Sequence, residues 1–196
     1  MDSLKNTDAI SLIARIRASD SSDDAFSELV SGYMPLINKR IASSGIPEEE
    51  YTEAQQEASI ALHDAALSYD AEKYEGVTFG LYASVCISNR LTSYVRARAR
   101  REERTDDFSE PEDLGSSVDI ESDVTTRDAF ERAMRVARSK LSELEFRVLC
   151  LSVEGYQVRD IAKALGLPSK TVENARYRYR RSLSEDKEIC GFLSQI

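Results

Sequence analysis

The stretch GYQVRDIAKALGLPSKTVENARYRYRR, from Gly155 to Arg181, decides how the second half of this chain folds. Small and apolar residues recur in it where two short helices joined by a tight turn must touch each other. These packing positions are Ile161, Ala162, Leu165, Leu167, Val172 and Ala175. Gly166 lies between the two helical segments, where the turn needs a residue that adopts positive φ without strain. The pattern predicts a helix-turn-helix.

The second helix of this motif keeps a polar face. At helical spacing, that face carries Ser169, Lys170, Glu173, Asn174 and Tyr177. Four arginines are interleaved with it or follow it, namely Arg176, Arg178, Arg180 and Arg181. Such a helix fits the major groove of DNA, with polar side chains for base edges and arginines for phosphates. The alternative is a small helical hairpin whose basic face is merely solvated.

The charge of the chain is unevenly distributed. The 196 residues carry a formal net charge of −9, which is unusual for a protein that binds nucleic acid. The segment from Thr105 to Thr125 contains eight acidic residues and neither Lys nor Arg. It also contains Pro111 and Gly115 and shows no helical period, a composition typical of a disordered linker. Outside this segment the chain is nearly neutral, and six arginines concentrate between Arg90 and Arg104.

Several classes of protein are disfavoured by what the sequence lacks. The three cysteines, Cys86, Cys150 and Cys190, show no metal-ligand spacing, so we expect free thiols, no metal and no cofactor. His63, the single histidine, has no nucleophile pattern around it, so we expect no enzyme. The N-terminus does not resemble a signal peptide, and no apolar run approaches the length of a membrane span. We therefore expect a cytoplasmic protein without a membrane partner.

The remaining pattern is helical throughout. Apolar residues recur at a period near 3.6, and no stretch alternates with period two. We expect helices over residues 7–18, 23–43, 47–69, 78–103, 126–140 and 143–154, before the helix-turn-helix. Ser142 and Glu145 predict a capping box at the start of the last of these. The expected fold is all-α, with a helical domain at 1–104, an acidic flexible linker at 105–125 and a helix-turn-helix domain at 126–196.

Two blocks of this sequence resemble bacterial sigma-70 family factors. Residues 53–62, followed by Tyr69 and Asp70 and then by a run of matched positions, look like region 2 of that family. The run consists of Phe79, Tyr82, Ala83, Cys86, Ile87 and Asn89. Residues 141–181 look like region 4, and the segment from Val172 to Ala175 is most similar to sigma-H-type alternative factors. The two blocks, in this order and at this spacing, identify the chain as a two-domain alternative sigma factor.

The resemblance implies partners and site residues. It implies binding to RNA polymerase core through the β′ coiled coil and the β flap, to promoter DNA, and in some members to an anti-sigma factor. Polymerase-binding positions match Glu53, Gln56 and Glu57. Positions that read the −10 element match Phe79, Tyr82, Asn89, Arg90, Thr92 and Arg96. Reading of the −35 element would fall to Ser169, Lys170, Glu173, Asn174, Arg176, Tyr177, Arg178 and Arg180.

Some features leave alternatives open. The chain contains no Trp, and Val85 and Cys86 occupy positions where primary sigma factors carry two tryptophans that unstack bases. Phe79 and Tyr82 also fit core packing, and Glu53, Gln56 and Glu57 also fit a solvated helix face. The expected function is a sigma factor that directs polymerase to promoters through the −10 and −35 elements. The alternative is a helix-turn-helix regulator or interaction module that no longer directs initiation.

Overall fold

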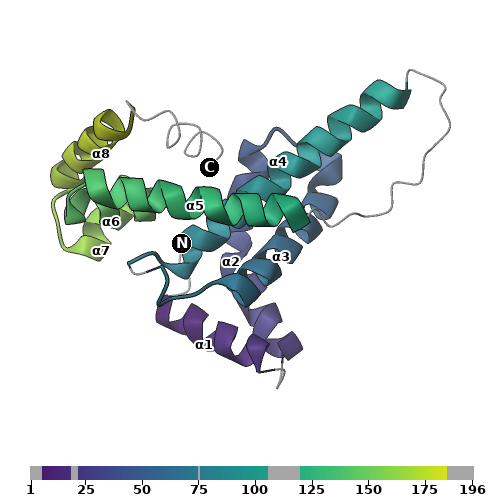
Figure 1. The fold of residues 1–196 in the computed structure, drawn as a ribbon, viewed down its shortest axis with the longest axis horizontal. Coiled ribbons are helices and arrows are strands. Elements are labelled where there is room, and N and C mark those ends of the chain that lie inside the picture. The colour runs from purple at the N-terminus through teal and green to yellow at the C-terminus, as the bar shows by residue number, and fades with distance from the viewer. Residues whose placement is uncertain (1–5, 19–21, 75, 106–119, 185–196) are drawn as a thin grey trace.

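In the computed structural model, which describes residues 6–18, 22–74, 76–105 and 120–184, the chain folds entirely into helices and connecting turns (Figure 1). The N-terminal helices are α1 (Asn6–Arg17), α2 (Ser22–Ser43), the short η1 (Glu48–Glu50), α3 (Tyr51–Ser68) and α4 (Phe79–Thr105). The C-terminal helices are α5 (Ile120–Lys140), α6 (Glu143–Val153), α7 (Val158–Leu165) and α8 (Ser169–Ser184). The all-α prediction is confirmed.

The close pairing of α3 with α4 forms the centre of the N-terminal half. Ala54, Ala58, Ala61 and Ala65 are all buried on one stripe of α3. Because alanine side chains are short, α4 approaches closely and fills the space with larger residues such as Leu81, Ile87 and Leu91, each at most 1% exposed. Helix α2 covers this pair with Leu29, Ile37 and Ile41.

The C-terminal half begins earlier than the sequence suggests. We expected helix to resume at residue 126, but α5 already begins at Ile120. The acidic composition that suggested a linker is equally suited to a helix N-terminus, where the helix dipole favours acids. The remainder of the expected linker, 106–119, lies outside the described residues, so its predicted disorder stays a prediction.

The predicted capping box is present at the start of α6. The Ser142 hydroxyl accepts a hydrogen bond from the Glu145 backbone N–H at 3.4 Å. In return, the Glu145 carboxylate accepts one from the Ser142 backbone N–H at 2.9 Å. Together these bonds satisfy two donors that the first turn of a helix leaves free, so α6 starts at a fixed residue.

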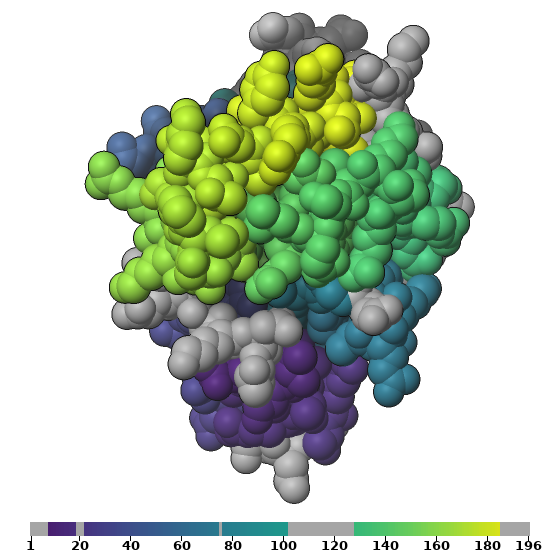
Figure 2. All heavy atoms as spheres, turned by 90° about the vertical axis from the view of Figure 1, so that its left-hand side faces the viewer, coloured from purple at the N-terminus to yellow at the C-terminus, as the bar shows by residue number. Residues whose placement is uncertain are grey.

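The two halves share one hydrophobic core. Helix α5 crosses in front of α4 and connects the N-terminal bundle with the helices of the helix-turn-helix (Figure 1). On its inner face, Phe130, Ala133, Met134 and Ala137 are buried in the same cluster as residues of α2 and α4. From the side, α5 and the helix-turn-helix form one continuous surface above α1 (Figure 2). The division of the chain into two domains stays a prediction, and in this structure the halves are packed together.

Candidate nucleic-acid and polymerase interfaces

The helix-turn-helix has the geometry that its sequence predicts. Gly166 ends α7 with φ of 64°, in the left-handed region where a side chain would be strained. This conformation reverses the chain so that the Leu167 N–H donates to the Ala162 carbonyl at 2.9 Å. Of the six predicted packing residues, Ile161, Ala162, Val172 and Ala175 are buried, while Leu165 and Leu167 are half-buried.

The polar face of α8 is open to solvent. Its five exposed residues are Ser169, Lys170, Glu173, Asn174 and Tyr177, as the spacing predicts. Tyr177 is 68% exposed, the most exposed large apolar side chain in the described part of the protein. Lys170 and Glu173 form an ion pair at 3.3 Å on the helix surface, so either side chain is free to turn toward a ligand at small cost. The face therefore offers donors, acceptors and one aromatic ring side by side.

The arginines of α8 are not equivalent. Arg180 and Arg181 are exposed, whereas Arg178 Nε lies 2.9 Å from Glu145 Oε1 and so connects α8 to the capped end of α6. Arg176 is half-buried, and its Nε is enclosed without a hydrogen-bond partner in the described structure. Arg178 thus links α8 to α6 through a partly exposed ion pair, and the expected contacts of these arginines with DNA stay predictions.

The predicted −10 and polymerase positions meet on the surface formed by α3 and α4. Arg90 Nε donates to Glu57 Oε2 at 2.6 Å, so a residue expected to contact DNA is paired with one expected to contact polymerase. The Thr92 hydroxyl donates to the Ser88 carbonyl one turn earlier at 2.8 Å. Asn89 is half-buried, and Arg96 is exposed on the same helix. Among these −10 positions, Arg96 is the most accessible.

The two aromatic residues of the expected −10 site lie in the core. Phe79 is fully buried, and its ring meets Tyr33 and Tyr69 edge-on, each with a centroid separation of 5.5 Å. Tyr82 is 3% exposed, and its hydroxyl lies 3.1 Å from the Ser68 hydroxyl. In this conformation burial leaves no ring face for a base, and the expected contact of these two residues with DNA stays a prediction. The core-packing alternative holds for both residues.

The exposed face of α3 carries expected polymerase-binding residues and also two exposed apolar side chains. Glu53 and Gln56 are exposed, and the Glu53 carboxylate lies 3.4 Å from the Tyr94 hydroxyl of α4. Farther along the same face, Ile60 and Leu67 are 46% and 49% exposed. Sequence analysis missed these two residues. The available signal was two large apolar side chains seven residues apart, interrupting the polar stripe of an amphipathic helix.

No group of side chains in the described residues has the arrangement of a metal site. His63 packs edge-on against Phe26, with a centroid separation of 5.0 Å, and its Nδ1 lies 3.9 Å from Asp64. This is the environment of a partly packed surface histidine. No helix among the described residues has the length and apolarity to cross a membrane.

Comparison with known proteins bears on the C-terminal half first. Residues 131–183 match the family described as Sigma-70, region 4. The matched stretch includes the second half of α5, all of α6 and α7 and nearly all of α8, so the helix-turn-helix lies within it. The family is non-enzymatic.

A longer similarity extends over most of the chain. The chain is 21% identical over 195 residues to the RNA polymerase sigma-H factor of Bacillus subtilis (strain 168), covering 91% of this chain and 88% of that protein. A solved structure described as CnrH in complex with the cytosolic domain of CnrY is 20% identical, with a TM-score of 0.40 and coverage of 91% and 96% of the two chains. The region 4 match and the similarity to a sigma-H factor together confirm the resemblance to alternative factors of the sigma-70 family.

Proposed function

We propose that this protein is a sigma factor that directs RNA polymerase core to specific promoters. The observation that carries the proposal is the exposed polar face of α8 within a region 4 domain. A helix held by α7 on one side and open on the other has the form that enters a major groove. On this proposal, Lys170, Glu173, Asn174 and Tyr177 read the −35 element, and Arg180 contacts phosphate.

The N-terminal half would bind polymerase and the −10 element. We assign the polymerase surface to α3, where Glu53 and Gln56 supply polar contacts and Ile60 and Leu67 supply apolar ones. An exposed apolar pair beside acidic residues is typical of a protein-binding face, because side chains of this size gain from being covered. The −10 element would meet α4 through Asn89, Thr92 and Arg96.

A second candidate function is a helix-turn-helix regulator that binds DNA without directing initiation. A specific observation favours it: Phe79 and Tyr82 are buried, and the chain contains no Trp, so no aromatic of the expected −10 positions is exposed to stack on unpaired bases. Stacking of this kind contributes roughly 1–3 kcal/mol per base, and its loss would weaken strand separation.

Reconstitution with core polymerase distinguishes the two functions. The purified protein is mixed with core enzyme and a library of genomic promoters, and the 5′ ends of the transcripts are sequenced. A sigma factor produces defined start sites that share sequences near −10 and −35. A regulator binds DNA alone, forms no complex with core enzyme and produces no start sites. Tyr177→Ala serves as a control, because it leaves the α3 surface intact. This variant should still bind core enzyme, and only its preference for −35 sequences should weaken.

A further inference from the structure

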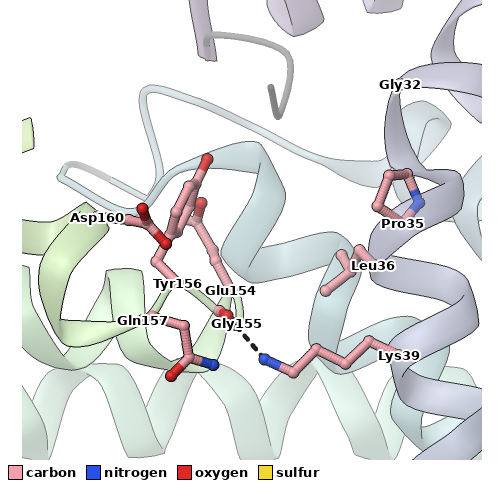
Figure 3. Close-up of a pocket in the computed structure, with 9 residues that line it drawn as sticks. All are labelled: Gly32, Pro35, Leu36, Lys39, Glu154, Gly155, Tyr156, Gln157 and Asp160. Atoms are coloured by element: carbon pink, nitrogen blue, oxygen red, sulfur yellow. Dashed lines mark hydrogen bonds between the residues drawn. The ribbon is translucent and has the colours of Figure 1, made fainter. Parts of the chain in front are cut away.

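The turn between α6 and α7 is docked on the N-terminal half (Figure 3). The Lys39 ammonium of α2 donates to the Gly155 carbonyl at 2.7 Å. Its neighbour Arg40 is only 8% exposed and donates to the Val153 carbonyl. The Arg40 guanidinium also donates twice to the Ser84 hydroxyl of α4, from Nη2 at 2.6 Å and from Nε at 3.1 Å. An almost buried arginine is costly unless it is hydrogen-bonded, so the docked turn supplies a partner that Arg40 needs.

Glu154, at the tip of this turn, brings its carboxyl group into the contact. The Thr78 hydroxyl donates to it, and Gly80 on the first turn of α4 leaves the space that it occupies. A Cβ atom on residue 80 would lie 3.0 Å from Glu154 Oε2. No Lys, Arg or His forms an ion pair with Glu154 within the described ranges. The carboxyl group is therefore half-buried between the two halves without a countercharge among the described ion pairs.

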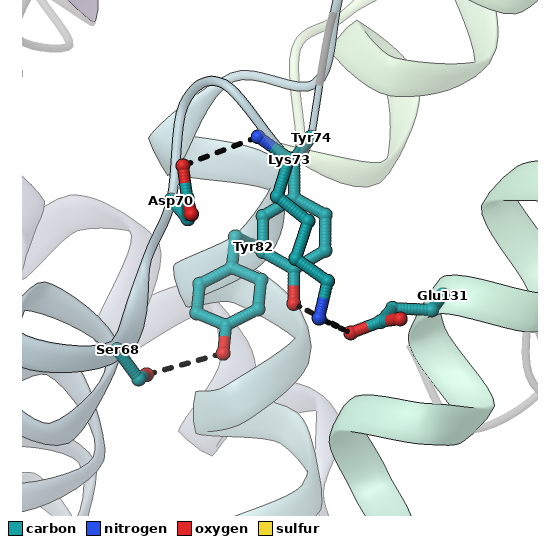
Figure 4. A network of polar contacts seen from close by, with 6 residues as sticks. All are labelled: Ser68, Asp70, Lys73, Tyr74, Tyr82 and Glu131. Carbon is teal, nitrogen blue, oxygen red and sulfur yellow. Dashed lines mark hydrogen bonds and ion pairs between the residues drawn. The ribbon is translucent and has the colours of Figure 1, made fainter.

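A second contact lies at α5 (Figure 4). The Phe130 ring meets Tyr74 and Tyr82 edge-on, with centroid separations of 5.5 and 5.3 Å. The Tyr74 hydroxyl donates to Glu131 at 3.2 Å, and the Lys73 ammonium lies 2.5 Å from the same carboxylate. Helix α5 thus covers the aromatic edge of the N-terminal half, and the docked turn holds the covering helices in place.

This closed arrangement conflicts with the proposed function unless it opens. Twenty-five base pairs between −35 and −10 span roughly 85 Å at 3.4 Å per base pair. A compact chain of 196 residues has a radius of gyration of about 16 Å. The two DNA-reading surfaces therefore cannot reach both elements while the halves are packed together.

We propose that the α6–α7 turn is a proton-operated latch, which holds the two halves together while Glu154 is protonated and releases them when it ionises. Its meaning for promoter binding rests on the proposed function, whereas the opening itself does not. Burial of an unpaired carboxylate costs much more than burial of a neutral carboxyl, and opening exposes Glu154 fully to water.

The pKa of Glu154 determines whether a rise in pH favours the closed or the open form. Burial raises its pKa from 4.5 to about 7, partly offset by the Thr78 hydrogen bond. The closed form therefore retains a proton at pH values where the open form has lost it. Closure is strengthened as pH falls from about 7 toward 4.5 and is lost as pH rises through about 7. The closed-to-open ratio should fall about 25-fold between pH 5.5 and 8.

The groups around Glu154 do not mask this titration. Tyr33 and Lys39 of α2, Tyr69 at the end of α3 and Cys150 of α6 all face the site. Burial raises the pKa values of the two tyrosines and brings that of the Cys150 thiol to about 12. Burial also lowers the pKa values of Lys39 and Arg40, which are directed at carbonyl groups rather than at the carboxylate.

Protons have access to the site. A cavity of about 150 Å³ lies between α2 and the start of α7, and Glu154 is among the residues that line it, together with Lys39, Tyr156 and Asp160. The lining is mainly apolar, but a space of this size with Glu154, Lys39 and Asp160 in its wall accommodates water. Glu154 can therefore exchange its proton with solvent before the halves separate.

Small-angle X-ray scattering on the full chain tests the latch. The radius of gyration of the wild type should increase as pH is raised from 5.5 to 8.5. Glu154→Gln, which keeps the shape of the neutral carboxyl, should stay compact over the whole range. Glu143→Gln, an exposed acid on the same helix, should behave as the wild type. A wild-type radius that does not change with pH, or a Glu154→Gln variant that expands like the wild type, overturns the proposal.

A second variant keeps the test decisive if Glu154→Gln fails to fold. Thr78→Val removes the hydrogen bond that favours the ionised carboxylate, so the pH midpoint of expansion should move upward. An unchanged midpoint contradicts the role of Glu154. Because scattering needs neither polymerase nor promoter, a pH-dependent expansion in a protein that fails to direct transcription supports the latch while refuting the proposed function.

Discussion

The two surfaces expected to meet DNA differ in how they are built. On α8 the polar face is open, and its side chains pair with at most one neighbour on the same helix. On α4 the aromatics are buried, and Arg90 is bonded to Glu57 of α3. A surface that only reads DNA can stay exposed in the free protein. Residues of a surface that also packs into the hydrophobic core contribute to both binding and stability. Single substitutions there therefore affect both.

The largest effect expected from this contrast is at Phe79. Phe79→Ala should lower the free energy of unfolding by about 3–5 kcal/mol, because it removes a fully buried ring and leaves a cavity. Urea unfolding followed by circular dichroism measures this. Tyr177→Ala on α8 should leave stability within about 0.5 kcal/mol while reducing affinity for −35 DNA. If Phe79→Ala were as stable as wild type and bound DNA less well, the contrast would fail.

The next largest effect is expected at Glu57. Glu57→Lys should weaken binding to core polymerase by about 2–5 kcal/mol, since it places a like charge against a basic partner surface. Stability should fall by only about 1 kcal/mol, because the Glu57–Arg90 pair is one-third exposed. Binding is measured by fluorescence anisotropy with labelled protein and core enzyme.

The double variant Glu57→Lys, Arg90→Glu separates two explanations. It restores an ion pair but not the acid at position 57. Stability should return while polymerase affinity stays low. Full recovery of affinity would mean that Glu57 acts only by holding Arg90.

On α8, two substitutions should have different consequences. Asn174→Ala should cost about 1–3 kcal/mol at one base position and relax the preference there. Arg180→Ala should weaken binding to all sequences alike and lower the salt slope by about one unit. Binding to a set of single-base promoter variants, repeated over a salt series, measures both. Equal shifts in sequence preference would contradict this division between base and phosphate contacts.

The smallest effect concerns the cap that positions α8 through Arg178. Ser142→Ala should cost about 1 kcal/mol of stability at pH 7. The hydrogen bond from the Ser142 backbone holds the pKa of Glu145 below 4.5, so the contribution of Glu145 is present above that pH and is lost as pH falls below it. Thermal unfolding of Glu145→Gln and wild type should therefore differ at pH 7 and converge as pH falls well below 4.5. A constant difference across this range would exclude an electrostatic origin.

Local patterns were sufficient to predict the helix-turn-helix. Gly166, the buried Ile161 and Val172, and the Ser142–Glu145 cap all depend on residues near in sequence, so helical period and turn chemistry are enough. The packing of α5 across the N-terminal half could not be predicted in this way. In sequence, Glu154 has the appearance of an ordinary acid at a helix end, and its burial depends on Thr78 and Gly80, which are far away in the chain.

The expected sites show the same limit. Exposure of Asn174 and Tyr177 follows from the helix face opposite the packing positions. Burial of Phe79 and Tyr82 depends on how many neighbours surround α4, and the apolar stripe of that helix was compatible with either outcome. Exposure of Ile60 and Leu67 contradicts their hydrophobicity, and only a tertiary structure reveals which apolar residues lack neighbours.

The contact between Arg40 and the Val153 carbonyl joins residues 113 positions apart, which has a consequence for synthesis on the ribosome. At about 5–20 residues per second, Val153 is added roughly 6–23 s after Arg40. During that interval the first four α-helices can already have collapsed around their alanine stripe, while the guanidinium still depends on water. The nascent chain therefore passes through a stage in which its N-terminal bundle is formed and its aromatic edge at Tyr74 and Tyr82 is uncovered. Chaperones and the polymerase itself would encounter that edge before α5 reaches it.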